Sequence, residues 1–208
     1  QAARDDRVGM SPEDGASYEE QVFDGLEFRQ QKIRSVTFEF CKFLSCDFSE
    51  TEFIDCKFSD CVFKDSNLTT VRLDGTKFSG TEFKDCKVTG VNWTSLNWSS
   101  VAFATPFFFD ACDLSYCVFA GLQLPELQVT RCKAHDVDFS ECDLGDADFF
   151  ETDLTNARFN RTRLKRSNFK GAINYAIDPL DNAIKGATFS VPDVLGLLSP
   201  FEINIADD

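Results

Sequence analysis

A large apolar residue returns at every fifth position along most of this chain. The series runs without a gap from Phe23 to Phe103, shifts by one residue around 104–108, and resumes from Phe109 to Phe169. We call these residues centres; 17 precede the shift and 13 follow it. A second series lies two residues before each centre, where nearly every residue is small or apolar and where all nine cysteines fall.

A period of five fits neither an α-helix nor a straight strand. Five residues rotate a helix by about 500°, so an apolar stripe would drift around it. On a straight strand, successive centres would alternate between the two faces. The pattern is consistent if the centre and the residue two before it both point inward, and the residue two after the centre is a corner that resets the alternation.

The corner positions are rich in residues that turn the chain at low steric cost. They include these glycine, aspartate and asparagine residues: Gly25, Gly75, Gly80, Gly90, Gly121, Gly171, Asp55, Asp60, Asp65, Asp85, Asp136, Asp146 and Asn156. Corners that turn in one sense wind the chain into a coil, and stacked coils satisfy each other's backbone groups. The sequence therefore predicts an all-β solenoid whose apolar centre is filled by side chains, many of them from the 23 phenylalanines.

Three segments carry a recognisable form of the repeat. Cys142-Asp143-Leu144, Ala147-Asp148-Phe149 and Thr152-Asp153-Leu154 resemble the A(D/N)Lxx motif of pentapeptide-repeat proteins. The resemblance implies a right-handed quadrilateral β-helix with four pentapeptides in each coil. Thirty centres then make about seven and a half coils, and at the usual strand spacing the rod would be about 35 Å long.

Two further segments resemble one subfamily more closely. They are Val91–Ser95 with Trp98, and the tail from Asn174 to Ile205. Both are similar to the proteins that protect type II topoisomerases, which include albicidin-resistance and microcin-immunity proteins and the Qnr quinolone-resistance group. The resemblance implies a DNA mimic that binds DNA gyrase or topoisomerase IV and counters a poison such as albicidin or a quinolone, as antibiotic resistance or self-immunity. The alternative is a scaffold for another protein partner, unrelated to topoisomerase.

The chain divides into three predicted parts. Residues 1–19 form a flexible polar segment, in which Met10 is expected to be the natural start and residues 1–9 an addition. Residues 20–173 form the repeat rod. Residues 174–208 form a capping segment, with Ser190 as the N-cap of a short helix that Pro200 ends, and a strand from Phe201 to Ile205.

The capping segment would cover the open backbone edge of the last coil. The resemblance implies that it also joins two copies head to head as a homodimer. The apolar residues expected at that interface are Val194, Leu195, Leu197, Leu198, Phe201, Ile203 and Ile205. A simple cap on a monomer is the alternative.

The formal charge of −14 argues against direct binding to nucleic acid or anionic lipid, which need positive charge. The chain contains no run of eighteen apolar residues and therefore no expected membrane span. The start lacks the apolar stretch of a secretory signal, so the protein is expected in the cytoplasm with reduced thiols. The charge permits a protein partner with a basic surface.

Acidic residues concentrate in one segment, which is the predicted partner-binding site. Its eight acids, with no base among them, are Asp136, Asp138, Glu141, Asp143, Asp146, Asp148, Glu151 and Asp153. The stretch from Arg158 to Lys170 then holds six bases and no acid. With twenty residues per coil, Asp138, Glu141, Asp143 and Asp146 should pair with Arg158, Arg161, Arg163 and Arg166, and Asp153 with Lys133. The segment is therefore either a partner surface or a face decorated with ion pairs.

The shift in register marks a second candidate contact, formed by Thr105, Pro106, Phe107 and Phe108. We interpret the shift as one inserted residue, which makes a bulge and leaves no long loop. Some members of the Qnr group project loops that matter for drug protection, so a loop-dependent mechanism is not expected here. The shift is either a bulge that only bends or offsets the rod, or a site where Phe107 and Phe108 form an exposed contact.

The sequence argues against an enzyme. The single histidine, His135, lies three residues after Cys132, which superficially suggests a nucleophile with its base or a metal pair. However, Cys132 occupies an inward position and His135 an outward one. We expect no catalytic residue, cofactor or metal site, since the chain also lacks a phosphate-binding glycine loop and zinc-ligand spacing.

Overall fold

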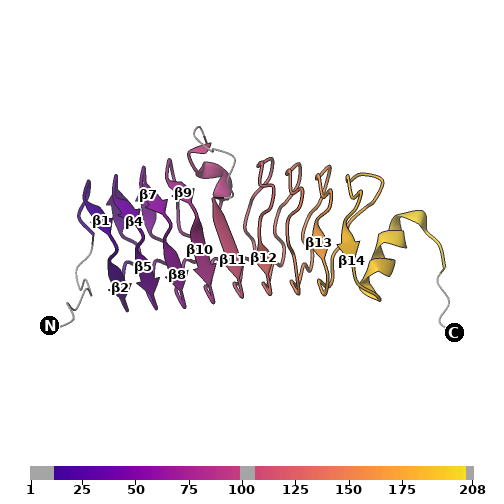
Figure 1. Ribbon diagram of the computed structural model, residues 1–208, viewed down its shortest axis with the longest axis horizontal. Coiled ribbons are helices and arrows are strands. Elements are labelled where there is room, and N and C mark those ends of the chain that lie inside the picture. The colour runs from indigo at the N-terminus through magenta and orange to yellow at the C-terminus, as the bar shows by residue number, and fades with distance from the viewer. Residues whose placement is uncertain (1–11, 99–105, 205–208) are drawn as a thin grey trace.

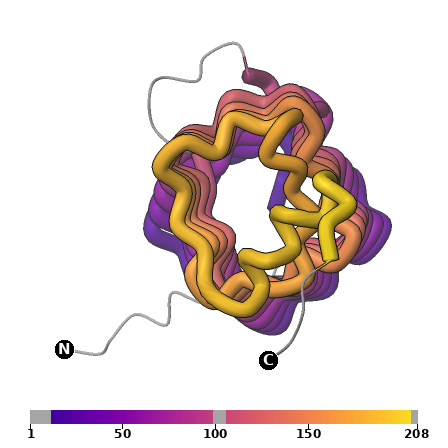
Figure 2. Tube along the Cα trace, turned by 90° about the vertical axis from the view of Figure 1, so that its right-hand side faces the viewer, coloured from indigo at the N-terminus to yellow at the C-terminus, as the bar shows by residue number. Residues whose placement is uncertain are grey.

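The computed structural model describes residues 12–98 and 106–204. The chain forms a parallel β-solenoid of about eight turns, which confirms the predicted fold class. Figure 1 shows the coils side by side from the N-terminal to the C-terminal end, and Figure 2 shows them superimposed along the axis.

The strands are short because each occupies one side of a coil. Their bounds are β1 (Ser17–Glu19), β2 (Val22–Asp24), β3 (Lys32–Arg34), β4 (Thr37–Glu39), β5 (Lys42–Leu44), β6 (Glu52–Ile54), β7 (Lys57–Ser59), β8 (Val62–Lys64), β9 (Lys77–Ser79), β10 (Thr81–Lys84), β11 (Phe107–Asp110), β12 (Val129–Thr130), β13 (Asn168–Phe169) and β14 (Thr188–Phe189). The short 3-10 helices are η1 (Trp93–Ser95) and η3 (Asp193–Phe201).

Parallel pairing between coils sets the register. Phe23 is opposite Phe43, and Phe43 is opposite Phe63, so each coil holds twenty residues and four pentapeptides. We name the sides by their sheets. Side A carries the order β12-β11-β10-β8-β5-β2 and also β13-β14, side C carries β3-β6, and side D carries β1-β4-β7-β9. Side B is joined by isolated bridges such as Lys133 to Asp153.

The centres stack along the axis and fill the rod. The rings of Phe43 and Phe63 lie 4.5 Å apart and nearly parallel, and those of Phe28 and Phe48 lie 4.8 Å apart. Within a coil, neighbouring rings meet edge to face, as Phe38 and Phe43 do at 5.2 Å. Both arrangements suit the charge distribution of aromatic rings, which explains why so many of the centres are phenylalanine.

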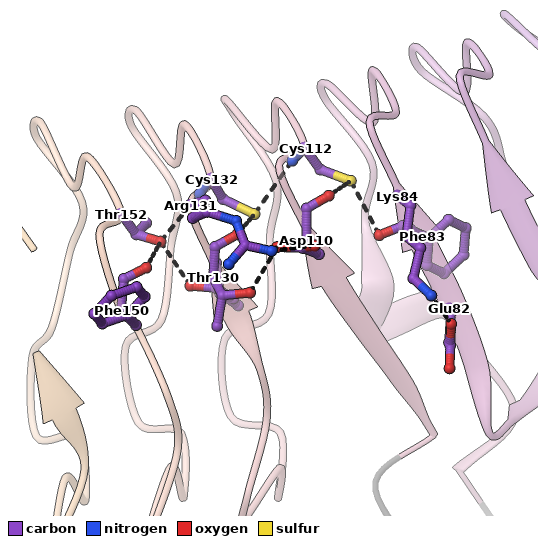
Figure 3. A network of polar contacts seen from close by, with 11 residues as sticks. Glu82, Phe83, Lys84, Asp110, Cys112, Thr130, Arg131, Cys132, Phe150 and Thr152 are labelled. Carbon is purple, nitrogen blue, oxygen red and sulfur yellow. Dashed lines mark hydrogen bonds and ion pairs between the residues drawn. The ribbon is translucent and has the colours of Figure 1, made fainter.

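The residues two before the centres point inward, as predicted, and many of them make axial hydrogen bonds. The Thr152 hydroxyl donates to the Val129 carbonyl at 2.6 Å and accepts from the Cys132 N–H at 3.2 Å. Cys132 accepts in the same way from the Cys112 N–H at 3.4 Å, as Figure 3 shows. Thiols and hydroxyls therefore satisfy backbone groups that no strand pairing reaches. All nine cysteines are buried and free.

The coil that contains the register shift is longer than predicted. Phe83 is opposite Phe109 and Thr81 is opposite Phe107, which is a spacing of 26 residues where other coils have 20. The chain between Trp98 and Pro106 therefore holds six additional residues, and the prediction of a single inserted residue is wrong. Counting in fives cannot separate an insertion of one from an insertion of six, because Phe103 keeps the phase.

The C-terminal segment continues the rod before it caps it. β14 pairs with β13, and Ala183 bridges to Arg163, so coil pairing extends past the predicted boundary at residue 173. The helix η3 then lies at the end of the rod (Figure 1), where Leu197 packs against the core.

Two details of the predicted cap are wrong. The Ser190 hydroxyl accepts a hydrogen bond from Gly171 N–H instead of capping η3, whose N-cap is Pro192. The helix includes Pro200 and ends at Phe201, and no strand follows in residues 202–204. Pro200 is the penultimate residue of the helix, so its missing N–H removes at most one helical hydrogen bond. Ile205 lies outside the described residues.

Candidate partner-binding surface

The eight predicted acidic residues form a ring around the rod. Residues 134–153 make one complete coil, because Lys133 bridges to Asp153 and Asp138 bridges to Arg158. The eight carboxylates therefore share one level of the rod but not one face. A partner that approaches from one direction meets only part of this ring.

Four of the eight acidic residues also have a local structural role. Asp138, Asp143, Asp148 and Asp153 each precede a centre, and each accepts a hydrogen bond from the N–H two residues later, at 3.0–3.1 Å. A short carboxylate or amide at this position closes the turn toward the corner. This bond explains why the repeat favours aspartate or asparagine before its centre.

The carboxylates of sides C and D are neutralised by the next coil. Arg158 bonds Asp138 at 2.8 Å, Arg163 bonds Asp143 at 3.2 Å, and Arg161 pairs with Glu141. Arg166 donates to Asp146 at 2.6 Å. All four predicted ion pairs are confirmed. We call these four acids the paired half of the ring: Asp138, Glu141, Asp143 and Asp146.

The predicted pair of Asp153 with Lys133 does not form. Lys133 lies between Asp113 of the preceding coil and Asp153 of the following coil, and its ammonium group pairs with Asp113 at 3.4 Å. Asp153 instead contacts His135 Nε2 at 2.8 Å and accepts from Asn174 at 2.9 Å.

The remaining acids cover side A, side B and the corners that flank side B. They are Asp136, Asp148, Glu151 and Asp153, which we call the open half of the ring. In the described residues none of them has an arginine or lysine partner; Asp148 accepts from the amide of Asn168 at 2.9 Å. Negative charge is therefore concentrated on one half of the perimeter.

Hydrogen bonds favour the ionised form of three carboxylates of the ring, Asp138, Asp146 and Asp153. The bond from Arg166 holds the pKa of Asp146 below its ordinary value. Partial burial would raise the pKa of Asp138, but hydrogen bonds from Ser140 and Arg158 outweigh it and lower that pKa. The pKa of Asp153 is lowered in the same way, against partial burial, by Asn174, Thr155 and His135. These carboxylates are charged at neutral pH.

The predicted contact at the register shift is only partly exposed. Pro106 and Phe107 are buried, and Phe107 packs against Trp93 at 4.6 Å, so its predicted exposure is wrong. Phe108 points outward from β11 and is half-buried in an open groove of about 400 Å³. Glu82, Lys84 and Arg131 line the same groove, and their side chains are drawn in Figure 3. Thr105 lies outside the described residues.

The structure separates Cys132 from His135. The Cys132 thiol is buried and contacts the Thr130 carbonyl at 3.2 Å, while His135 points outward to Asp153. Within residues 12–98 and 106–204, no group of three or more potential ligands could hold a metal ion. In the same residues, no helix has the length and hydropathy to cross a membrane.

Two exposed aromatic residues were not predicted from the sequence. Phe40 and Tyr116 occupy corners, where the two residues are 54% and 65% exposed. The sequence could have indicated them, since an aromatic residue is unusual at a corner. The repeat pattern, however, predicts only that a corner turns the chain.

Comparisons with known proteins give a family and a fold. The family described as pentapeptide repeat region matches residues 36–106 and 107–169. A trypsin-treated form of QnrB1, a plasmid-mediated fluoroquinolone resistance protein, has a similar structure, with a TM-score of 0.56 and 17% identity over 91% of this chain and 100% of that one. HetL, involved in heterocyst differentiation regulation in the cyanobacterium Nostoc, has a TM-score of 0.55 and 16% identity over 86% and 87% of the two chains. No curated protein matches the sequence.

Proposed function

This chain belongs to the pentapeptide-repeat family, and on that basis we propose that it is a DNA mimic that binds a type II topoisomerase. The enzyme would be DNA gyrase or topoisomerase IV. By binding, the protein would protect the enzyme from a gyrase poison such as albicidin or a quinolone, as resistance or self-immunity in the cytoplasm.

The observation that carries the proposal is the open half of the acidic ring. B-DNA presents about one charge per 1.7 Å of its axis, and this rod is a much weaker polyanion. A basic DNA-binding surface would therefore engage the rod where its carboxylates are not already neutralised. Asp136, Asp148 and Glu151 meet that condition, whereas the paired half does not.

The longer coil is compatible with a loop-dependent mechanism of protection. The expectation that protection does not depend on a loop rested on a single inserted residue, and six are present. These six residues leave room for a loop-dependent contribution.

A scaffold for another protein partner is the second candidate. HetL is as similar in fold as QnrB1 is, and HetL is involved in heterocyst differentiation regulation. The fold is therefore compatible with partners other than a topoisomerase. Both candidates are non-enzymatic, and neither requires the protein to bind nucleic acid directly or a membrane.

We further propose that the protein acts as a homodimer joined by its C-terminal segment. Leu195, Phe201 and Ile203 are exposed on and beside η3 at the end of the rod, while Val194 and Leu198 are half-buried. Apolar residues gathered at one end are typical of an interface.

Drug-trapped cleavage by gyrase tests the proposed function. The neutralised variant Asp136→Asn, Asp148→Asn, Glu151→Gln should lose most of its ability to reduce cleavage and restore supercoiling, because it lacks the open carboxylates. The amide that replaces the Asp148 carboxylate would keep the turn hydrogen bond. The matched control Asp60→Asn, Asp65→Asn, Asp85→Asn removes the same charge from corners of the N-terminal half. If the wild-type protein at micromolar excess changes neither drug-trapped cleavage nor supercoiling, the scaffold candidate replaces this proposal.

A further inference from the structure

Tyr116 is exposed although neither packing nor turn formation requires it. Among the described residues before Ile173, Phe40 and Tyr116 alone are large hydrophobic residues with exposed side chains. Tyr116 has a φ of 65°, in the left-handed region that glycine, asparagine and aspartate occupy most easily. An aromatic residue is unfavourable at a left-handed φ, and an exposed ring buries little apolar surface. The stability of the fold therefore does not explain a tyrosine at this corner.

The neighbours of Tyr116 along its corner are small on one side and acidic on the other. Gly90 occupies the equivalent corner of the preceding coil, because Gly90 N–H donates to Ser115 O. Asp136 occupies the equivalent corner of the following coil, and Tyr116 N–H donates to His135 O at 2.9 Å. Tyr116 therefore lies one coil away from a corner without a side chain and one coil away from a carboxylate of the open half.

The other charged groups near this corner are already engaged. Lys133 pairs with Asp113 at 3.4 Å, and His135 contacts Asp153 at 2.8 Å. Asp138, on the adjoining side C, pairs with Arg158. Asp136 is the nearby carboxylate for which the described residues provide no cationic partner.

We propose that Tyr116 and Asp136 together bind an arginine side chain of a basic protein partner. An arginine guanidinium is planar, stacks on an aromatic face and donates to a carboxylate at its edge, which lysine cannot do in one geometry. Aromatic anchors of this kind commonly contribute much of the binding energy of an interface. This inference rests on the proposed function only for the identity of the partner, since the arginine site itself is a property of these two residues.

Binding to DNA gyrase tests the inference with a matched control. Tyr116→Asn keeps a residue that accepts left-handed φ, as Asn156 does, and should weaken binding by about tenfold, the loss expected from one cation–π contact. Phe40→Asn removes the other exposed corner aromatic and should change affinity by no more than about twofold. Equal affinity of the wild type and Tyr116→Asn would overturn the inference. Failure of the wild type to bind gyrase would overturn the proposed function instead.

A second measurement is independent of gyrase. Short peptides that differ only in carrying arginine or lysine are titrated while the ring resonances of Tyr116 are followed by NMR. The arginine peptide should shift these resonances more than the lysine peptide does, and Asp136→Asn should reduce the difference. Equal shifts with both peptides, or no shift with either, would refute the arginine site.

Discussion

At the scale of single residues, the inward position before each centre has a hydrogen-bonding role as well as a packing one. Thr152 joins two coils through its hydroxyl, and cysteine takes the same place at Cys112 and Cys132. The cysteines are therefore weak-donor equivalents of serine and threonine in this core. Burial raises the pKa of the Cys117 thiol to about 12, so this thiol is a poor nucleophile.

Replacing Thr152 tests that role. Thr152→Val keeps the volume but leaves the Val129 carbonyl and the Cys132 N–H without a partner, which should lower the free energy of unfolding by about 1–3 kcal/mol. Thr152→Cys, which restores a weak donor and acceptor, should cost clearly less. Denaturant unfolding measures both variants, and equal losses would show that packing alone sets this position.

Protonation of the ring should weaken the fold. The pKa values of Asp138, Asp146 and Asp153 are lower in the folded protein than the unfolded value of about 3.9. Their charged forms therefore stabilise the fold above that value, and the contribution disappears as pH falls through the folded pKa values. Thermal unfolding at pH 7, 5 and 3.5 should show little change in the first interval and a marked drop in the second.

Asp138→Asn provides the control for this pH dependence. The amide keeps the hydrogen bond to Ser140 but cannot ionise, so the drop below pH about 4 should be smaller. An identical pH profile for this variant and the wild type would exclude Asp138 as a source.

At the scale of the elements, alternation within each pentapeptide determined what could be predicted. Because inward and outward positions follow from the phase, the burial of Cys132 and the pairs of Asp138 with Arg158 and Asp143 with Arg163 were all predictable. The phase of the repeat does not reveal how many whole pentapeptides are inserted, so the sequence predicted an insertion of one residue where the structure has six. The alternation of Phe201 to Ile205 also predicted a strand wrongly, because no neighbouring strand edge is paired with it in the described residues.

Deleting residues 101–106 tests the role of the long coil. The deletion returns that coil to twenty residues and places Ser100 at the corner, as Ser35 and Ser45 are in other coils. Loop length affects stability only weakly, so the change should be below about 1 kcal/mol. A loss of several kcal/mol in denaturant unfolding would contradict this. Retained drug protection would place the activity on the rod surface.

At the scale of the whole molecule, charge and apolar surface occupy different places. The open half of the ring faces outward on sides A and B, and exposed apolar residues gather on and beside η3 at the C-terminal end. The sequence predicted the eight acids and, from the twenty-residue coil, also predicted which four pair with arginine. Asp153 is the exception. Its position one coil after Lys133 predicted a pair with that residue, but in the structure Asp153 contacts His135.

The proposed dimer predicts a clear effect of charge at the C-terminal end. Phe201→Arg should convert the dimer to a monomer in sedimentation velocity, because the apolar interface would then have to bury an unpaired charge. Phe40→Arg is the matched control, since Phe40 is similarly exposed and arginine already occupies corners such as Arg131. A Phe201→Arg variant that still sediments as a dimer would place the interface elsewhere.

Competition with DNA on the topoisomerase is the most decisive test of DNA mimicry. Fluorescence anisotropy of a labelled duplex on DNA gyrase follows its displacement by this protein, by the Asp136→Asn, Asp148→Asn, Glu151→Gln variant and by the Asp60→Asn, Asp65→Asn, Asp85→Asn control. We predict displacement by the wild type and the control, and a loss of about tenfold or more in apparent affinity for the open-half variant. No displacement by the wild type, or equal displacement by all three proteins, would show that the open carboxylates do not stand in for DNA.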